Sequence, residues 1–214
     1  MRKTPLVALF LQHPKCSIDS GNGIIRSLRK YYNFKIFTYD TLSDNFFDDV
    51  DLIAVPGGIG DADYFSRSFR NNKTPIENYI NRGGHYLGIC MGAYWADKYY
   101  FNLLKDVRVV QYIKQPNTDT KRPHAKACDI YWNKQPDKMY FYDGCAFTGN
   151  GKFNTIASYA NGDPMAIMQN RIGLIGCHPE SDRDWYDKPY LERYWHDYRH
   201  DQLLLDFTND LIKR

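Results

Sequence analysis

The sequence lacks long hydrophobic runs. The longest, residues 6–11, is far shorter than the roughly 18–20 apolar residues that cross a membrane. It follows Met1-Arg2-Lys3, but it is also too short for a signal peptide, and no small-residue cleavage site comes after it. We therefore expect no membrane contact and interpret residues 6–11 as a buried strand.

The chain also has no large excess of one charge and no closely spaced cysteines. The chain has 28 Lys and Arg against 25 Asp and Glu, and this net charge of +3 is too small for a typical nucleic-acid or membrane-surface protein. Its five cysteines are odd in number and widely spaced, which argues against a disulfide framework and favours a reducing, cytoplasmic environment. No motif indicates a cofactor, so we expect none.

Aromatic side chains are abundant: 18 Tyr, 12 Phe and 4 Trp make up 16% of the chain. Aromatic residues stack on bases in single-strand-binding proteins, but basic residues accompany them there. The densest stretch, residues 182–201, carries four basic and six acidic residues, so its charge is wrong for nucleic acid. Simple packing, a cap over a site, and a subunit interface such as that of a homodimer remain open.

Strand and helix patterns alternate along the first half of the chain. Continuous apolar or β-rich runs lie at residues 6–11, 34–39, 52–55 and 86–89. Helical spacing follows the turn-like Ser20-Gly21-Asn22-Gly23, resumes from Pro75 to Gly83, and returns at about residues 92–100. This rhythm predicts a doubly wound, parallel sheet.

Short extended runs between turns replace this rhythm in the second half. They lie at residues 107–110, 128–132, 139–141, 154–159 and 165–169, and predict an antiparallel extension of the sheet. A further strand is expected at residues 171–177, and a final helix from Pro189. No linker or repeat divides the chain, so we expect a single domain over residues 1–214.

The densest chemical signal is Gly88-Ile89-Cys90-Met91-Gly92-Ala93, where an apolar strand turns sharply into a helix. Such a strand-to-helix elbow holds a nucleophile up at the edge of a sheet, and a helix amino end favours a thiolate. A buried core cysteine is the alternative, and the flanking glycines argue against it. Cys177, beside His178, is a second candidate nucleophile. Because it lies at a strand end next to the candidate base, we expect it to point to the opposite face and to be a buried small hydrophobe.

A nucleophilic thiol needs a base, and His178 leaves the end of a strand two residues before Glu180. A carboxylate at that distance can orient the imidazole and stabilise its charged form. A solvated His-Pro turn is the alternative. The glycine-rich turn at Gly57 and Gly58, after another strand, leaves backbone N–H groups that can face an oxyanion, although such turns are often plain loops.

Taken together, these segments resemble the class I glutamine amidotransferase-like superfamily, and within it the biotin–protein ligase N-terminal-domain-like family. The likeness rests on residues 56–64, on residues 82–94 and on His178-Pro179-Glu180, in this order. It implies a flavodoxin-like α/β fold, a Cys90–His178–Glu180 triad, and an oxyanion hole formed by the Gly58 and Met91 amides. It also places four residues at the substrate: Gly57, Asp61, Tyr64 and Tyr94.

One position departs from the glutamine-using members. They usually carry glutamine two residues after the second glycine of the elbow, whereas this chain has Tyr94. The resemblance therefore supports thiolate chemistry better than glutamine specificity. We expect a cysteine-dependent amidase or amidotransferase-like enzyme acting on a small-molecule or other amide, with ammonia passing to a separate ligase or synthetase if it is used. A catalytically idle fold that binds a ligand or partner is the alternative.

Two further segments carry weaker signals for a binding site. His196 and His200 are one helical turn apart, as in some metal sites, but no third ligand accompanies them. We interpret them as part of a solvated helix face and predict no metal site. The basic loop at residues 121–126 is expected to be solvated as well.

Overall fold

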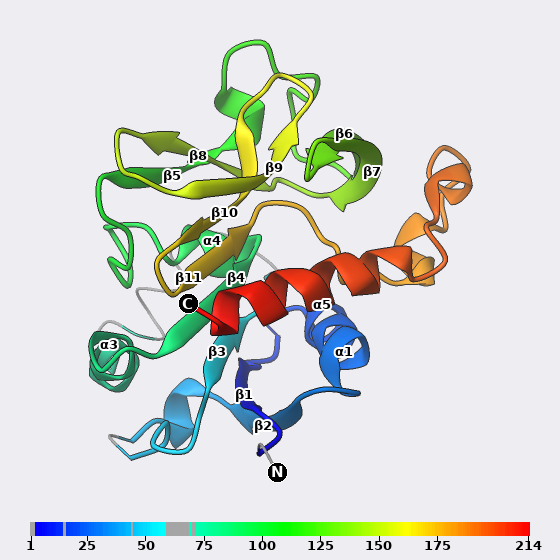
Figure 1. Cartoon of the computed structure of the whole chain (residues 1–214). Helices are drawn as coiled ribbons and strands as arrows, with labels where there is room; N and C mark the ends of the chain where they lie inside the picture. The colour runs from blue at the N-terminus through cyan, green and yellow to red at the C-terminus, as the bar shows by residue number, and fades with distance from the viewer. Residues whose placement is uncertain (1–2, 15, 44, 59–68, 70–71) are drawn as a thin grey trace.

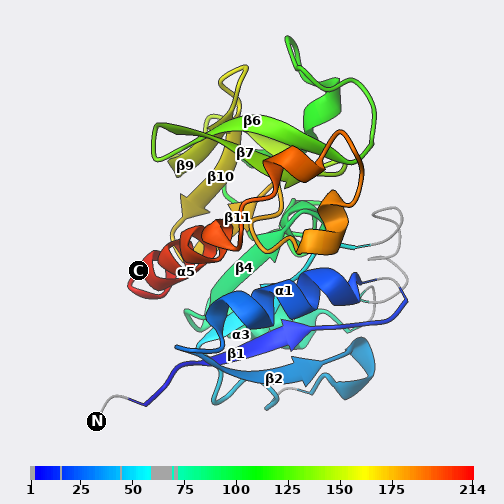
Figure 2. The same cartoon turned by 90° about the vertical axis from the view of Figure 1, so that its right-hand side faces the viewer.

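The computed structural model describes residues 3–14, 16–43, 45–58, 69 and 72–214 of the chain. Two residues predicted to contact substrate, Asp61 and Tyr64, lie outside this part. The described residues form a mixed α/β fold in which helices lie on both faces of a long sheet (Figure 1 and Figure 2). The fold class expected from the sequence, a doubly wound, mostly parallel sheet with an antiparallel extension, is confirmed.

Five neighbouring strands of the sheet are parallel, in the order β2, β1, β3, β4 and β11. Their bounds are, in that order, Asn33–Phe37, Leu6–Phe10, Leu52–Val55, His85–Ile89 and Ile172–Ile175. Because the carboxyl ends of parallel strands meet at one edge of a sheet, the segments that follow β3, β4 and β11 come together there.

The sheet continues from β11 through the antiparallel strands β10, β9, β6 and β7. Their bounds are, in that order, Pro164–Gln169, Asn154–Tyr159, Lys126–Trp132 and Gln135–Phe141. A separate ladder pairs β5 (Val107–Gln111) with β8 (Cys145–Gly149). The sequence patterns indicated β5 but did not indicate β8.

The sheet separates the hydrophobic core into two layers, and helices cover each layer. Helices α1 (Ile18–Leu28) and α5 (Arg199–Ile212) cover one face of the parallel strands, and α3 (Thr74–Asn81) and the short α4 (Met91–Tyr94) lie on the other. Side chains alternate between the faces along β1, as the period of a strand requires. Thus Val7 packs with α1 and α5, whereas Ala8 packs with α3.

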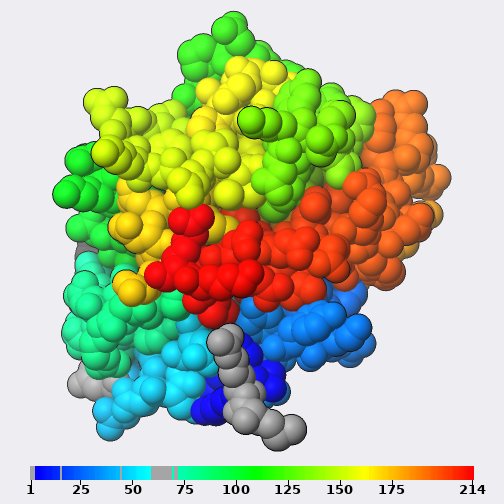
Figure 3. Space-filling model, viewed as in Figure 1, coloured from blue at the N-terminus to red at the C-terminus, as the bar shows by residue number. Residues whose placement is uncertain are grey.

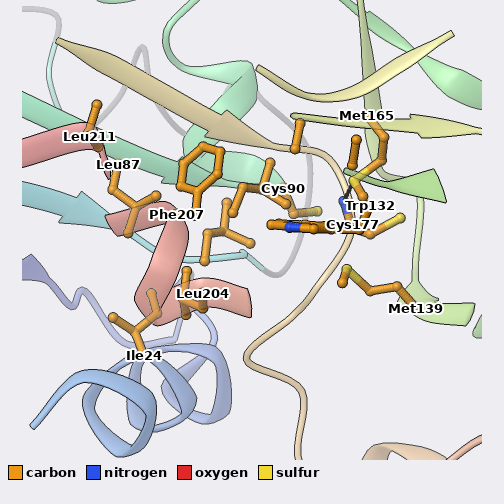
Figure 4. Packing of buried hydrophobic residues seen from close by; sticks show 14 of the residues in the cluster. Ile24, Leu87, Cys90, Trp132, Met139, Met165, Cys177, Leu204, Phe207 and Leu211 are labelled. Carbon is orange, nitrogen blue, oxygen red and sulfur yellow. Dashed lines mark hydrogen bonds between the residues drawn. The ribbon is translucent and has the colours of Figure 1, made fainter. Parts of the chain in front are cut away.

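Helix α5 lies where the two halves of the molecule meet. Its side chains Leu204 and Phe207 pack close to Leu87 of β4, and Ile24 of α1 joins them (Figure 4). The space-filling view shows α5 in red between the N-terminal segments and the antiparallel extension (Figure 3). Short 3₁₀ turns complete the description: η1 (Tyr39–Thr41), η2 (Tyr112–Lys114), η3 (Arg183–Tyr186) and η4 (Glu192–Tyr194).

Helix α1 begins earlier than the glycine-rich segment suggests. The Ser17 side chain caps it by accepting a hydrogen bond from the Ser20 N–H at 3.1 Å. Gly23 therefore lies inside the helix, where a Cβ would come within 2.1 Å of the Glu180 carbonyl oxygen. The glycine permits close packing here, inside the helix, and is not part of a turn that precedes it.

The expectations for two other helices were wrong in length or position. The helix after Cys90 ends at Tyr94, because the buried Asp97 carboxylate accepts hydrogen bonds from Arg108 Nε at 3.0 Å and the Val109 N–H at 2.9 Å and so holds the chain against β5. The final helix begins at Arg199 and not at Pro189, since the preceding residues form η3 and η4 and bury Tyr186 in a small aromatic cluster. Within the described ranges, no helix combines the length and apolar character needed to cross a membrane.

Candidate active site

Cys90 lies at the sharp turn between β4 and α4. Its backbone has φ 49° and ψ −103°, which is unusual for a residue with a side chain. The Cys90 N–H donates to the Ile175 carbonyl at 2.8 Å, and the turn packs so closely that a Cβ on Gly92 would lie 2.1 Å from the Val55 carbonyl oxygen. This strain and crowding are the features of a nucleophile elbow.

His178 follows β11, the strand beside β4. Its N–H donates to the Tyr140 carbonyl at 2.9 Å, which ties it to the end of β7. Its Nδ1 lies 2.8 Å from Glu180 Oε1, and both side chains are buried. Because Nδ1 faces the carboxylate, Nε2 is the nitrogen left to serve the thiol.

The electrostatics of this pair favour an imidazolium. Burial by itself would lower the pKa of His178, but the charges of Glu180 and Cys90, with hydrogen bonds to both, outweigh it and raise the pKa to about 10. The Cys90 thiol also lies 3.8 Å from the Tyr142 carbonyl oxygen. The buried His178–Glu180 pair therefore lies beside the Cys90 thiol, and Cys90 and His178 line the same cavity.

The glycine turn after β3 meets this chain from the other side. Gly57 is so close to the imidazole that a Cβ there would lie 2.8 Å from His178 Cε1. A Cβ on Gly58 would lie 1.8 Å from Met91 Sδ, so the two residues predicted to form an oxyanion hole are neighbours. The Gly57 carbonyl is already engaged, because it accepts from the Ser17 N–H at 3.0 Å.

A cavity of 570 Å³ opens over these residues. Cys90, His178, Gly57, Gly58, Met91 and Tyr94 line it, so the structure brings together every described residue predicted for the site except Glu180, which lies behind His178. The volume suits a small molecule or a single side chain. That these residues catalyse a reaction is a prediction.

Part of the cavity lining is aromatic and comes from Tyr140 and from the stretch 182–201, for which a cap over a site was one of the open alternatives. The Trp185 ring centroid lies 5.2 Å from that of His178, and the Tyr140 and Trp185 centroids are 5.0 Å apart. Tyr94 reaches across the cavity and donates its hydroxyl to the Asp143 carbonyl at 3.2 Å. Part of the aromatic stretch 182–201 thus caps the cavity, while Tyr186 packs inside.

Three carboxylates, Asp19, Asp143 and Asp184, share the lining with one lysine, Lys188. Burial raises the pKa of Asp143, and burial together with the charges of Asp182 and Asp19 raises the pKa of Asp184. The rim is therefore acidic, in contrast to the basic grooves that bind nucleic acids.

Ser20 is the polar residue that sequence reasoning missed. Its hydroxyl is buried and donates to Glu180 Oε1 at 2.6 Å. The only sequence signal was its place in a turn-like Ser-Gly-Asn-Gly segment, which gave no indication of a partner 160 residues away.

The other cysteines and histidines lie away from the cavity. Cys177 is buried, its thiol is 3.7 Å from the Tyr159 hydroxyl, and burial raises its pKa. It packs in the same apolar cluster as Cys90 but follows β11, whereas Cys90 follows β4 (Figure 4). In the part of the chain that the structure describes, no group of three or more His, Cys, Asp or Glu is placed to hold a metal ion.

The expectation that His196 and His200 are solvated was wrong. Both rings are buried and stacked, with centroids 3.8 Å apart. His200 Nε2 lies 3.1 Å from Asp137 Oδ2, and His196 Nε2 lies 3.3 Å from Ser181 Oγ. The physical reason is that the segment before α5 packs the rings of Tyr186 and Trp195 against His196, which in turn stacks on His200.

Comparisons with known proteins agree with this architecture. Residues 15–111 match the family model described as biotin-protein ligase, N terminal. No curated protein matches the chain in sequence. The motif-based resemblance is nevertheless confirmed, since the matched segment contains the glycine turn and the Cys90 elbow.

Solved structures match over nearly the whole chain. A glutamine amidotransferase from Thermotoga maritima has a TM-score of 0.70 at 11% identity, covering 100% of each chain. PurLQS from the same organism has 0.65 at 16% identity, covering 96% of this chain and 100% of that one. A glutamine amidotransferase from Methylobacillus flagellatus has 0.62 at 11% identity, covering 98% and 93%. The chain therefore has the fold of the glutamine amidotransferases, and its residues 15–111 match the model of the biotin-protein ligase N-terminal family.

Proposed function

We propose that the protein is a cysteine-dependent amidase or amidotransferase-like enzyme. The observation that carries this proposal is the buried pair of His178 and Glu180 beside Cys90, at a strained elbow that opens into a cavity. A buried charge network of this kind is costly to maintain and is concentrated at functional sites. Structural neighbours that are glutamine amidotransferases support the same class of reaction.

In the first half of the proposed reaction, Cys90, whose proton already rests on His178, attacks the amide carbon as a thiolate. A bond forms between Sγ and the carbonyl carbon, and the carbonyl oxygen gains the charge. The Gly58 and Met91 amides are the donors proposed for this oxyanion, because these two neighbouring residues line the cavity together with Cys90. His178 then protonates the leaving amine as the C–N bond breaks.

In the second half, water attacks the thioester. His178 accepts a proton from this water, the C–S bond breaks, and the acid leaves with the thiol restored. Glu180 keeps its charge throughout and stabilises the imidazolium that forms twice in the cycle. The net reaction consumes one water and yields one acid and one amine or ammonia.

Glutamine specificity is a separate question from this chemistry. The Tyr94 side chain, which stands where many glutamine-using members carry glutamine, is held by its hydrogen bond to the Asp143 carbonyl. We therefore propose an amide substrate of small size and place glutamine among the compounds to test. If ammonia is the useful product, a separate ligase or synthetase would receive it.

The experiment compares the wild type with Cys90→Ala and, as a matched control, Cys128→Ala, which removes a buried cysteine outside the cavity. Release of ammonia or amine is measured for glutamine and a panel of simple amides, and thiol labelling by iodoacetamide is mapped by mass spectrometry. We expect labelling at Cys90, and a loss of turnover of about 10³-fold or more in Cys90→Ala only.

Labelling that persists in Cys90→Ala and maps to Cys16, Cys128, Cys145 or Cys177 would overturn the assignment. Selective labelling of Cys90 with no amide turned over would support the alternative, a fold that binds a ligand or partner without catalysis.

A further inference from the structure

The first turn of α1 enters the candidate active site. Ser17 caps the helix, and Ser20, one turn on, is completely buried with its side chain toward the triad. A buried hydroxyl must satisfy both its proton and its lone pairs. The partners of Ser20 come from two separate parts of the site.

The direction of each hydrogen bond at Ser20 is fixed by chemistry. The Gly57 N–H has only a proton to offer, so it donates to Ser20 Oγ, at 2.9 Å. The Ser20 proton then goes to Glu180 Oε1, at 2.6 Å. The same oxygen accepts from His178 Nδ1 at 2.8 Å. One continuous chain therefore runs from the glycine turn through Ser20 and Glu180 to the imidazole.

Glu180 depends on this chain for its orientation. Both side-chain hydrogen bonds that the carboxylate accepts end on Oε1. Among the described residues, its buried Oε2 has no hydrogen-bond partner. The terminal torsion of glutamate is soft, so a carboxylate held only by the imidazole would turn easily. Ser20 is the second, independent point of attachment.

A different residue of α1 holds the backbone of the same segment. The Arg26 guanidinium donates to the Glu180 carbonyl at 2.9 Å and to the Ser181 carbonyl at 3.2 Å, and forms an ion pair with Asp182. Backbone and carboxylate are thus fixed by separate side chains. Removing the Ser20 hydroxyl leaves the Arg26 contacts in place.

We propose that Ser20 is a positioning residue that couples the Gly57–Gly58 turn to the triad carboxylate. Through Glu180 it sets the imidazole toward Cys90, and through the Gly57 N–H it sets the peptide that precedes the candidate oxyanion donor. This inference rests on the proposed function and adds a fourth member to the triad.

The test uses iodoacetamide labelling of Cys90 at pH 7, which reports on how the imidazole activates the thiol and needs no substrate. The variants are Ser20→Ala, Ser20→Thr, which keeps the hydroxyl, and Ser27→Ala. Ser27 is a matched control, because it is also buried on α1 but donates only to the Gly23 carbonyl of its own helix, at 2.8 Å.

We expect the labelling rate to fall about tenfold in Ser20→Ala, as loss of a hydrogen bond to a charged group predicts. Ser20→Thr should regain most of this rate, and Ser27→Ala should match the wild type, with thermal unfolding as the check on folding. Equal rates in Ser20→Ala and the wild type would overturn the inference. So would equal losses in Ser20→Ala and Ser27→Ala, or in Ser20→Ala and Ser20→Thr, because either result would point to packing alone.

The outcome is independent of whether an amide is turned over. Rapid labelling at Cys90 without hydrolysis of any amide would contradict the proposed function. The labelling rates of the variants would still decide the role of Ser20.

Discussion

Two buried imidazoles in the same stretch of chain have opposite titration behaviour. The pKa of His178 is raised to about 10, because the charges of Glu180 and Cys90 outweigh the effect of burial. The pKa of His196 is lowered to about 3, because burial and the neighbouring His200 and Arg199 charges all disfavour its protonation. Burial acts in the same direction on both rings, so the difference comes from their partners.

The partners differ in kind. His178 has a carboxylate at 2.8 Å, whereas His196 has the Ser181 hydroxyl at 3.3 Å and the stacked His200 ring. The nearby carboxylate, Asp137, contacts His200 and Arg199 and not His196. One imidazole is therefore built to carry a charge and the other to avoid it.

The largest effect is expected from Glu180→Gln, which removes the charge while keeping the shape. Burial then acts with less opposition, so the pKa of His178, measured by NMR titration of the labelled imidazole, should fall from about 10 to below pH 7. Amide turnover should fall about 10³- to 10⁴-fold, as in other triads that lose their carboxylate charge. The exposed Glu192→Gln is the control. An unchanged His178 titration would show that Glu180 does not set its charge.

Gly57→Ala should have the next largest effect. The new Cβ would lie 2.8 Å from His178 Cε1, so the imidazole must shift while the rest of the turn stays in place. We expect Cys90 labelling and turnover to fall about 10- to 100-fold, since displacements of about 1 Å have effects of that size. Retained activity with normal thermal unfolding would mean that the ring position tolerates the shift.

The smallest effect concerns His196 and stability in acid. Its folded-state pKa of about 3 lies below the unpaired value of 6.5, so the unfolded chain binds a proton that the folded chain refuses between these two pH values. The free energy of unfolding should therefore fall as the pH drops through this window. The drop attributable to His196 should be about 1–2 kcal/mol, allowing for solvent screening.

Chemical denaturation of the wild type and His196→Gln at several pH values from 7 to 4 measures this contribution as the difference between the two curves. Curves that stay parallel over the whole range would contradict it. His178 predicts the reverse slope, because its stabilisation is complete below pH 6.5 and is lost as the pH rises through about 10.

Local sequence patterns were sufficient for the parallel half of the fold and for the elbow. Apolar strands followed by turn glycines predicted β1, β3 and β4 at or within a residue or two of their observed bounds, since a strand covered on both faces needs a continuous apolar run. The same reasoning picked out Cys90 and His178, which follow strands that turn out to be neighbours.

Features that depend on contacts between distant segments could not be predicted in this way. The helix expected from Pro189 and the solvated state expected of His196 were both wrong, because tertiary packing of aromatic rings overrode the local helical pattern. Ser20 escaped notice for a related reason. A serine hydroxyl has no sequence signature until its partners are known, and here they lie at residues 57 and 180.

The pairing of β4 with β11 has a consequence for when the candidate site comes together during synthesis. Tyr86 is in register with Ile172, and the whole antiparallel extension is formed by the residues between them. Such a long-range pairing is slow to form. Cys90 therefore leaves the ribosome well before His178, and the two residues can meet only once β11, the last strand that the structure describes, is in place. Under the proposed function, the reactivity of Cys90 would then report that β11 has paired with β4.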